Sequence, residues 1–437
     1  MDSIDNNLLV EAAPTKDLFI YMLTRDINLI DAIVDLTDNS IDGARRLRSD
    51  DRYDDLWVRI EATQKHFKIT DNCGGLDEDT ARHYAFRFGR PPGMPSTRHS
   101  VGQFGVGMKR SLFKLGRKFQ VESRTDTGYF RIEVNVDEWK ERPEWEFRFD
   151  ELAPQPPTDY PDATNTRITV TDLYESVAES FGLENFLNHL RSRLKYSQRE
   201  AIAKGLTISL NKLAIEEATI YFLQSDELKV ANRENTIEGN SPMNIRLLTG
   251  VAASDPNSAG WHVFCNGRLV LQADKSLTTG WGENSGTTIP VYHNQFARFR
   301  ACAFFDCDDA GLLPWNTTKN GVNMDSLSYT SARLQMIMMM RPVIDFLNKL
   351  DMEKNQDDKP LENAINNAKL VSLSEVIPAE RFEIVVKVSP QKPSTRNITY
   401  SRPAEDIERV RDILGAKTLR EVGEKTFDYF YESECVE

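Results

Sequence analysis

Five polar side chains that can hold a cation or accept hydrogen bonds recur along one predicted helix. Residues 26–44, DINLIDAIVDLTDNSIDGA, place apolar residues on two sides of this helix, because successive residues turn by about 100°. A narrow polar stripe lies between these sides and contains Asp31, Asp35, Asp38, Asn39 and Asp42. Burying unpaired carboxylates is costly, so the stripe must meet water, a cation or hydrogen-bond donors. A hydrated groove and a metal–phosphate site both remain open.

A glycine-rich segment offers a second kind of chemistry. The stretch 101–116, VGQFGVGMKRSLFKLG, has three glycines within six residues and then a basic, helix-like pattern. Without Cβ atoms, such a segment lets amide N–H groups at a helix N-terminus approach an anion such as a phosphate chain. From residue 80 to residue 120 the chain carries nine Lys and Arg and no Asp or Glu. A strand-to-helix turn with a solvated basic face is the alternative.

Two predicted strands supply the remaining candidates. In ITDNCGGLD, residues 69–77, Asp71 stands at a strand end, where a carboxylate can accept the exocyclic N–H of adenine. Gly75 lets a flat base approach the backbone. Farther along the chain, Thr166 stands at the head of the alternating strand in NTRITVTDLY.

In this order, the four pieces resemble the ATP-binding motifs of the GHKL superfamily. Its Bergerat-fold members include type II topoisomerases, MutL, HSP90-like chaperones, MORC proteins and sensor histidine kinases. The resemblance implies that Asp35 orients the attacking water and that Asn39 offers its amide oxygen to Mg²⁺ beside the phosphates of ATP. It also implies nucleotide contacts by Asn39, Asp42, Asp71, Gly75, Gly102, Gln103, Phe104, Gly105, Val106, Gly107, Lys109 and Thr166.

The sequence departs from the family pattern at two points. Family members usually have glutamate where this chain has Asp35, and the shorter side chain predicts slow hydrolysis with binding preserved. The first glycine of the family pattern D-x-G-x-G is Cys73 here. GQFGVG is similar to the lid motif of HSP90-like chaperones, whereas Lys109 and KLG are more like MORC proteins. The resemblance implies that residues 94–100 form the mobile part of an ATP lid.

A second αβ region follows the ATP-binding motifs. It contains a strand pair with an Asn266-Gly267 turn and a closing helix at about 326–350, which we expect to be interrupted at Pro342. Lys319, in WNTTKNG, resembles the lysine that MutL, gyrase and MORC proteins send from a transducer domain to the γ-phosphate. We therefore predict a catalytic role for Lys319 beside Asp35.

The predicted architecture is α/β (α+β) with three parts. The resemblance implies a two-layer α/β sandwich ATPase domain at 1–215 and an S5-like α/β transducer domain at 216–350. Residues 351–437 are expected to be a linker and a small, mostly helical appendage, with helices at 403–414 and 417–432.

The composition of the 437 residues limits the classes of function. Neither a secretion signal nor an apolar run of bilayer length is evident, so we expect a soluble, cytoplasmic protein without a membrane partner. The five cysteines show no paired C-x-x-C spacing, which argues against a zinc site. A net charge of −13 argues against a surface devoted to nucleic acid.

The resemblance therefore predicts a slow, Mg²⁺-dependent ATPase that forms a homodimer when ATP binds, an ATP-gated clamp most similar to MORC and MutL proteins. Such proteins act on double-stranded DNA, and the basic segment 80–120 and the cluster Arg191, Arg193, Lys195 and Arg199 are the candidate contacts. An effector protein is a further expected partner. An HSP90-like module that binds a protein client is the alternative. A histidine kinase is disfavoured, because no histidine lies in a helical hairpin ahead of the motifs.

Overall fold

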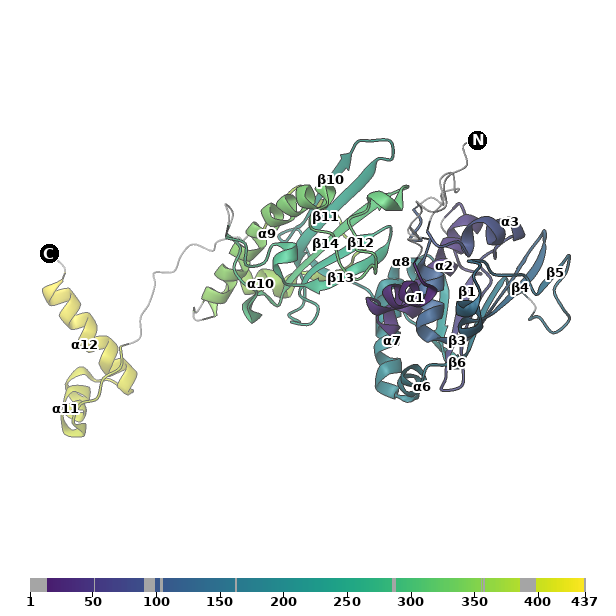
Figure 1. The fold of residues 1–437 in the computed structure, drawn as a ribbon. Coiled ribbons are helices and arrows are strands. Elements are labelled where there is room, and N and C mark those ends of the chain that lie inside the picture. The colour runs from purple at the N-terminus through teal and green to yellow at the C-terminus, as the bar shows by residue number, and fades with distance from the viewer. Residues whose placement is uncertain are drawn as a thin grey trace. The chain divides into compact units, whose positions relative to one another are not determined.

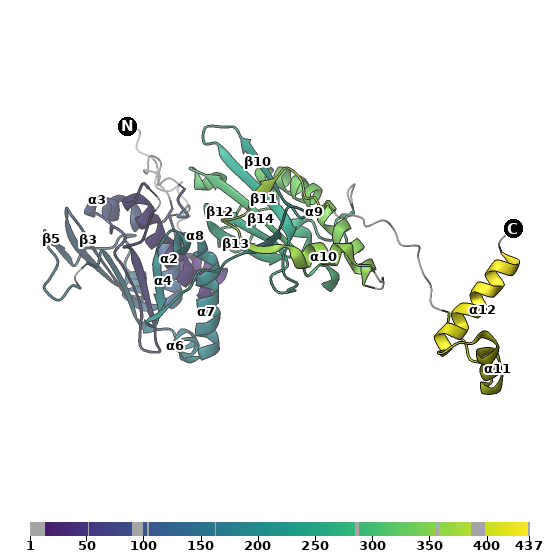
Figure 2. The same cartoon turned by 180° about the vertical axis from the view of Figure 1, so that it is seen from behind.

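The computed structural model describes residues 14–50, 52–89, 99–102, 105–161, 163–284, 288–354, 356, 358–385 and 398–435. The chain divides into two compact units, Met1–Val386 and Lys387–Glu437. The first unit contains two α/β domains, each built on its own large sheet (Figures 1 and 2).

The first domain is a two-layer α/β sandwich on an eight-stranded sheet of order β5-β4-β3-β6-β2-β1-β7-β8. Neighbouring strands are antiparallel except β1 and β7, which are parallel. The register of β2 against β6 sets Asp71 directly opposite Thr166. The strands are β1 (Trp57–Ala62), β2 (Phe67–Asp71), β3 (Gly116–Thr125), β4 (Gly128–Asn135), β5 (Glu151–Ala153), β6 (Thr166–Leu173), β7 (Thr207–Leu210) and β8 (Leu213–Ala214).

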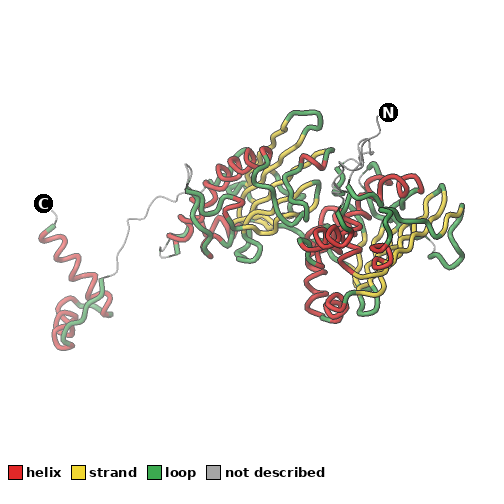
Figure 3. Tube along the Cα trace, in the orientation of Figure 1, coloured by secondary structure: helices red, strands yellow, loops and turns green. Residues whose placement is uncertain are grey.

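Helices cover one face of this sheet, with α2 packed against α4 and α7 (Figure 3). The predicted helix at 26–44 is confirmed as α2, which begins after Asn28, whose side chain accepts the Asp31 N–H at 2.8 Å. The helices are α1 (Lys16–Arg25), α2 (Leu29–Leu47), α3 (Glu78–Thr80), the π-helical turn η2 (Ala81–Ala85), α4 (Gly107–Leu115), α5 (Val136–Glu141), α6 (Glu175–Gly182), α7 (Glu184–Ser197) and α8 (Arg199–Ala203).

The second domain has a six-stranded sheet of order β13-β12-β14-β11-β10-β16, with the long helix α9 packed on β11 and β14. A separate ladder joins β15 to β9. The strands are β9 (Tyr221–Gln224), β10 (Val230–Ile237), β11 (Met243–Val251), β12 (Gly260–Cys265), β13 (Arg268–Asp274), β14 (Phe299–Cys307), β15 (Lys369–Ser372) and β16 (Pro378–Ala379). The helices are α9 (Leu327–Glu353), α10 (Pro360–Asn367) and the 3₁₀ turns η3 (Leu277–Thr279), η4 (Asn294–Phe296) and η5 (Ala310–Leu312).

The predicted interruption at Pro342 is wrong. Helix α9 runs through this proline without a break. A proline inside a helix removes one hydrogen bond, but apolar side chains on both sides of it are fully buried in the core of the second domain, including Met336, Met340, Val343 and Ile344. Tertiary packing of this apolar face therefore outweighs the local penalty.

The unit Lys387–Glu437 contains two helices, α11 (Ala404–Leu414) and α12 (Leu419–Glu434), close to the predicted bounds. Gly415 ends α11 in the left-handed conformation, with φ of 59°. Among the described residues of the whole chain, no helix is long and apolar enough to span a membrane.

Candidate functional site

The polar stripe of α2 is buried and lies against cationic side chains. Asp31, Asp35, Asp38 and Asp42 are each no more than 5 % exposed. The α2 sequence buries apolar side chains on both flanks of the stripe, which forces these carboxylates inside the protein. Each of them therefore depends on partners from other elements, and these partners define the chemistry of the site.

Asp35, the predicted base, is held by two cations from different parts of the chain. Arg110 on α4 donates from Nη2 to Oδ2 of Asp35 at 2.5 Å, and Lys319 donates from Nζ to Oδ1 at 3.2 Å. Lys319 comes from the loop between η5 and α9, so the structure brings together the two predicted catalytic residues across 284 positions of sequence.

Asp38 shares the ammonium group of Lys319. The Nζ atom lies 3.1 Å from Oδ2 of Asp38, while Gln198 donates to Oδ1 at 2.7 Å and Arg268 lies 3.5 Å from the same oxygen. Burial opposes ionisation of Asp38, but Arg268 and Lys319 hold its pKa below the ordinary value. Burial likewise opposes the charge of Lys319, but Asp35 and Asp38 hold its pKa above the ordinary value. These carboxylates and cations form a buried cluster of alternating charges.

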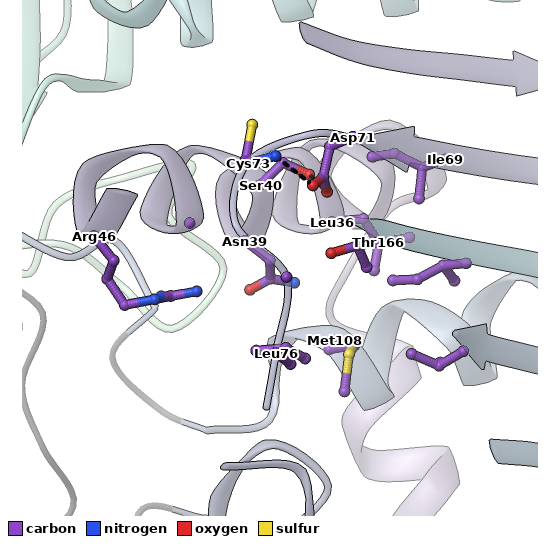
Figure 4. A pocket seen from close by; sticks show the side chains of 14 residues that line it. Leu36, Asn39, Ser40, Arg46, Ile69, Asp71, Cys73, Leu76, Met108 and Thr166 are labelled. Atoms are coloured by element: carbon purple, nitrogen blue, oxygen red, sulfur yellow. Dashed lines mark hydrogen bonds between the residues drawn. The ribbon is translucent and has the colours of Figure 1, made fainter. Parts of the chain in front are cut away.

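A pocket lies beside the stripe, on the flank of α2 that faces the end of β2 (Figure 4). Its apolar walls suit a flat ring, and its polar groups gather at Asp71. The lining residues are Leu36, Asn39, Ser40, Gly43, Arg46, Ile69, Asp71, Cys73, Gly75, Leu76, Met108, Val121, Thr166 and Ile168. Four predicted nucleotide-binding residues, Asn39, Asp71, Gly75 and Thr166, therefore share one cavity.

Asp71 is 4 % exposed and accepts hydrogen bonds on both carboxylate oxygens. Ser40 donates to Oδ2 at 2.7 Å, and the Cys73 N–H donates to Oδ1 at 2.9 Å. Burial raises the pKa of Asp71, although these two donors and the Thr166 side chain counteract it. Carboxylate oxygens accept more than one hydrogen bond each, so Asp71 retains capacity for a donor on a ligand.

Two glycines allow the backbone to close around this pocket. A Cβ atom on Gly43 of α2 would lie 2.5 Å from the Cys73 carbonyl oxygen, so only glycine lets the helix approach the turn after β2. Gly75 has φ of +69°, and a Cβ atom there would lie 2.5 Å from the Arg124 carbonyl oxygen. Gly75 thus packs closely against the Arg124 backbone in the pocket wall, and its role in admitting a flat base stays a prediction.

Asn39, the predicted Mg²⁺ ligand, lines the pocket one turn after Asp35. Its Nδ2 atom is buried and has no hydrogen-bond partner among the described residues. An acceptor oxygen of a ligand or a water molecule beside Asn39 would pair this N–H group, whereas Mg²⁺ would bind the amide oxygen. Among the described residues, no group of three or more His, Cys, Asp or Glu side chains forms a metal site. A Mg²⁺ ion here would therefore take most of its ligands from phosphates and water.

The glycine-rich segment lies beside two carboxylates of the stripe, Asp42 and Asp35. The Gly102 N–H donates to Oδ2 of Asp42 at 2.8 Å, so Asp42 contacts the segment itself. Gly107 starts α4, and a Cβ atom there would lie 3.6 Å from Oδ2 of Asp35. Val106 caps this helix, and Gly105 has φ of 63°. Gln103, Phe104 and most of the predicted lid, residues 94–98, lie outside the described residues.

Lys109 lies beneath this segment, buried to 1 % exposure. Its ammonium group donates to the carbonyl oxygens of Ala85, at 2.8 Å, Arg87, at 2.6 Å, and Gly105. All three of its donors are engaged by backbone. In this structure Lys109 fixes the start of α4 to the segment before it, and a phosphate contact would require it to leave these carbonyls.

Several site residues were missed by sequence reasoning. Arg110, Arg268 and Gln198 complete the carboxylate cluster, and only their tertiary contacts identify them. Arg46 follows Asn39 by seven residues, two helical turns, so the helical period could have indicated that it shares the face of Asn39. Figure 4 shows Arg46 reaching from α2 beside Asn39.

Comparison with known proteins agrees with this geometry. Residues 27–166 match the family model described as "Histidine kinase-, DNA gyrase B-, and HSP90-like ATPase". This segment has the GHKL fold. The matched range begins just before α2 and ends at Thr166, so it contains the stripe, the glycine-rich segment and all of the pocket lining except Ile168. The description of this family is that of an ATPase.

The chain was also compared with solved structures and with curated proteins. The chain is similar to a structure titled "Crystal structure of B-subunit of the DNA gyrase from Myxococcus xanthus", with 14% sequence identity and a TM-score of 0.43. The similarity covers 79% of this chain and 96% of that chain. No curated protein matches the sequence.

Proposed function

We propose that this protein binds Mg²⁺–ATP in the pocket around Asp71, hydrolyses it slowly, and transmits the presence of the γ-phosphate to its second domain through Lys319. The observation that carries this proposal is the pair of contacts from Lys319 to Asp35 and Asp38, at 3.2 Å and 3.1 Å. A lysine of the second domain thus contacts α2, the helix that also lines the proposed nucleotide pocket.

Binding would use the groups that line the pocket. Asp71 would accept the adenine amine, and the apolar side chains of Leu36, Met108 and Ile168 would pack on the ring. Asn39 would hold Mg²⁺, which neutralises phosphate charge when bound. The free amide N–H groups at the start of α4 would meet the phosphates, as at other helix N-termini.

Hydrolysis requires Asp35 to accept a proton from water. In the resting structure Lys319 occupies Oδ1 and Arg110 occupies Oδ2 of this carboxylate. A γ-phosphate would compete with Asp35 for the ammonium group of Lys319. When this ammonium group moves to the phosphate, Oδ1 of Asp35 becomes free to accept a proton from water. In this scheme, ATP binding makes the Asp35 carboxylate available as the base. The loop that carries Lys319 moves with the second domain.

The finer assignment as an ATP-gated clamp of the MORC and MutL type, which dimerises and acts on DNA, rests on the motif resemblance. Some of the basic side chains predicted to contact DNA instead form ion pairs within the chain. Arg193 lies 3.3 Å from Asp31, and Arg199 lies 3.6 Å from Glu217. Lys109 and Arg110 are buried. A DNA contact would therefore use other cations of segment 80–120, and a protein client remains the alternative.

The test is titration calorimetry of the full chain with a non-hydrolysable ATP analogue, with and without Mg²⁺, followed by turnover and mass measurements with and without duplex DNA. We expect Mg²⁺-dependent binding, a dimer with the analogue, and turnover that responds to DNA. Asp35→Asn should bind nucleotide and lose hydrolysis. Normal hydrolysis by Asp35→Asn would refute the assignment of the base. Turnover that responds only to unfolded protein would favour the chaperone-like module.

A further inference from the structure

The short segment His99–Gly102, here called the anchor segment, is bound to both domains of the first unit. The Val101 side chain is 2 % exposed and belongs to the hydrophobic core of the second domain, although the residue lies within the GHKL range. The Ser100 carbonyl oxygen accepts a hydrogen bond from Nδ2 of Asn266 at 3.0 Å, and the His99 ring lies 3.4 Å from the Asp308 carboxylate.

On its other side, the anchor segment is held by α2. Asp42 accepts hydrogen bonds from the Val101 N–H at 3.0 Å, from the Gly102 N–H at 2.8 Å, and from the Ser100 hydroxyl at 2.9 Å. These three donors occupy a carboxylate that is 5 % exposed. The anchor segment therefore lies between the nucleotide-binding helix and the second domain.

Arg45 joins the two sides of this arrangement. Its Nη1 atom donates to the His99 carbonyl oxygen at 2.7 Å and lies 3.2 Å from Asp42, and its Nη2 atom donates to the Asn266 carbonyl oxygen at 2.7 Å. One guanidinium of α2 thus contacts both the anchor segment and the second domain. Such a forked contact fixes relative position as well as distance.

Hydrogen bonds within the second domain orient the side chain that makes this contact. Asn266 and Gly267 form the turn between β12 and β13, with φ of 46° and 75°. The Asn266 amide is 2 % exposed and is oriented by Cys307, whose N–H donates to Oδ1 at 2.9 Å and whose carbonyl oxygen accepts from Nδ2 at 2.9 Å. A Cβ atom on Gly267 would lie 2.2 Å from Glu200, so the turn also abuts α8 closely.

We propose that the Asn266–Gly267 turn positions the anchor segment, and with it the start of α4 at Gly105–Gly107, so that nucleotide binding and the second domain are coupled by a route separate from Lys319. This inference rests on the proposed function. Only two residues separate Gly102 from Gly105, so displacement of the turn would carry the phosphate-facing amides with it. Asn266 is a positioning residue in this scheme, because it acts through Ser100.

The decisive variant is Asn266→Asp, which keeps the size and the acceptor toward the Cys307 N–H but removes the Nδ2 donor to the carbonyl oxygens of Ser100 and Cys307. Val101→Ala is a second variant that shortens the buried anchor side chain. Asn211→Asp is the matched control. Asn211 also has a positive φ, of 50°, in the β7–β8 turn, and its amide exchanges hydrogen bonds of 2.9 Å and 3.0 Å with the Ala62 backbone.

The experiment combines titration calorimetry and steady-state kinetics with hydrogen exchange of the full chain, with and without a non-hydrolysable ATP analogue and Mg²⁺. In the wild type, the analogue should protect the amides of the β12–β13 hairpin. Asn266→Asp and Val101→Ala should abolish this protection and raise KM and the analogue Kd about tenfold, as expected when the anchor segment loses its contact with the second domain, with kcat nearly unchanged. Asn211→Asp should behave as the wild type.

The outcomes separate this inference from the proposed function. If the wild type binds no analogue, the proposed function fails. If the wild type binds but both anchor variants match Asn211→Asp in affinity and hairpin protection, the coupling route is refuted alone. If Asn266→Asp does not fold, Val101→Ala decides, because it removes only two methyl groups.

Discussion

Asp71→Asn should separate nucleotide binding from folding. The variant keeps the shape of the side chain, and its amide oxygen can still accept the Cys73 N–H that now lies 2.9 Å from Oδ1. Its NH₂ group would then replace Oδ2, which accepts from Ser40 at 2.7 Å, and the Ser40 hydroxyl can rotate to accept instead. The second hydrogen of this NH₂ group would point at the adenine amine, donor against donor.

The size of the effect follows from this reversal. A hydrogen bond to a charged acceptor contributes about 1.5–3 kcal/mol, and a buried donor left without a partner costs about 1–3 kcal/mol. Together they predict a loss of about 2.5–6 kcal/mol of binding free energy, which is about 10²- to 10⁴-fold in Kd. We therefore expect ATP binding to be undetectable at ordinary titration concentrations.

The stability of the nucleotide-free protein should change in the opposite direction. Burial raises the pKa of Asp71 in the folded state, so folding favours its protonated form. The stability linked to this group is present at low pH and is lost as pH rises through the folded-state pKa, so the ionised carboxylate destabilises the protein at neutral pH. Asp71→Asn removes that cost, and its melting temperature should equal or exceed that of the wild type.

Titration calorimetry and thermal unfolding without ligand check both halves of this prediction. Glu122→Gln is the matched control, because Glu122 is 2 % exposed on strand β3 of the same sheet but is paired with Arg167 and lies outside the pocket lining. It should lose stability and retain ATP affinity. Wild-type affinity in Asp71→Asn would refute the assignment of Asp71 as the adenine acceptor.

Three further predictions follow from the charged and titratable groups. Arg46→Ala should weaken ATP and ADP binding by about fivefold or less without affecting adenosine binding, as expected for one exposed cation near phosphate. Arg48→Ala, at the same helix end but outside the pocket lining, is the calorimetric control. An equal loss of adenosine affinity in Arg46→Ala would contradict a phosphate contact. Lys319→Met should destabilise the protein by less than the about 3–5 kcal/mol of a buried charge left without any partner, because Asp35 keeps Arg110 and Asp38 keeps Arg268. Adding Asp38→Asn should recover part of that loss in urea unfolding, and strictly additive effects would show that the two groups are not coupled. Burial lowers the pKa of His262 from 6.5 to about 4, so His262 is protonated at a higher pH in the unfolded state than in the folded state. The free energy of unfolding should therefore drop by about 3 kcal/mol from pH 6.5 to pH 4. His262→Gln should lack this pH dependence in urea titrations, and an unchanged pH dependence would assign it to other groups.

Much of the pocket was predictable because its elements are local in sequence. The spacing of apolar and acidic residues in 26–44 predicts α2 and its stripe, since helical period depends only on neighbours along the chain. The small residues after Asp71 predict a tight turn for the same reason. The order of these motifs was enough to indicate a GHKL domain, which the family comparison confirms for residues 27–166.

Only the tertiary structure determined what neutralises the stripe and which domain holds the anchor segment. The partner of a buried carboxylate depends on which cations packing brings within about 4 Å, and that is not encoded in its neighbours along the chain. Lys319 reaches Asp35 across 284 positions, Arg268 comes from another sheet, and Val101 leaves the GHKL domain to enter the core of the second domain. The sequence by itself determined the elements of a nucleotide site, whereas domain packing decided its resting charge pairs and its connections to the rest of the molecule.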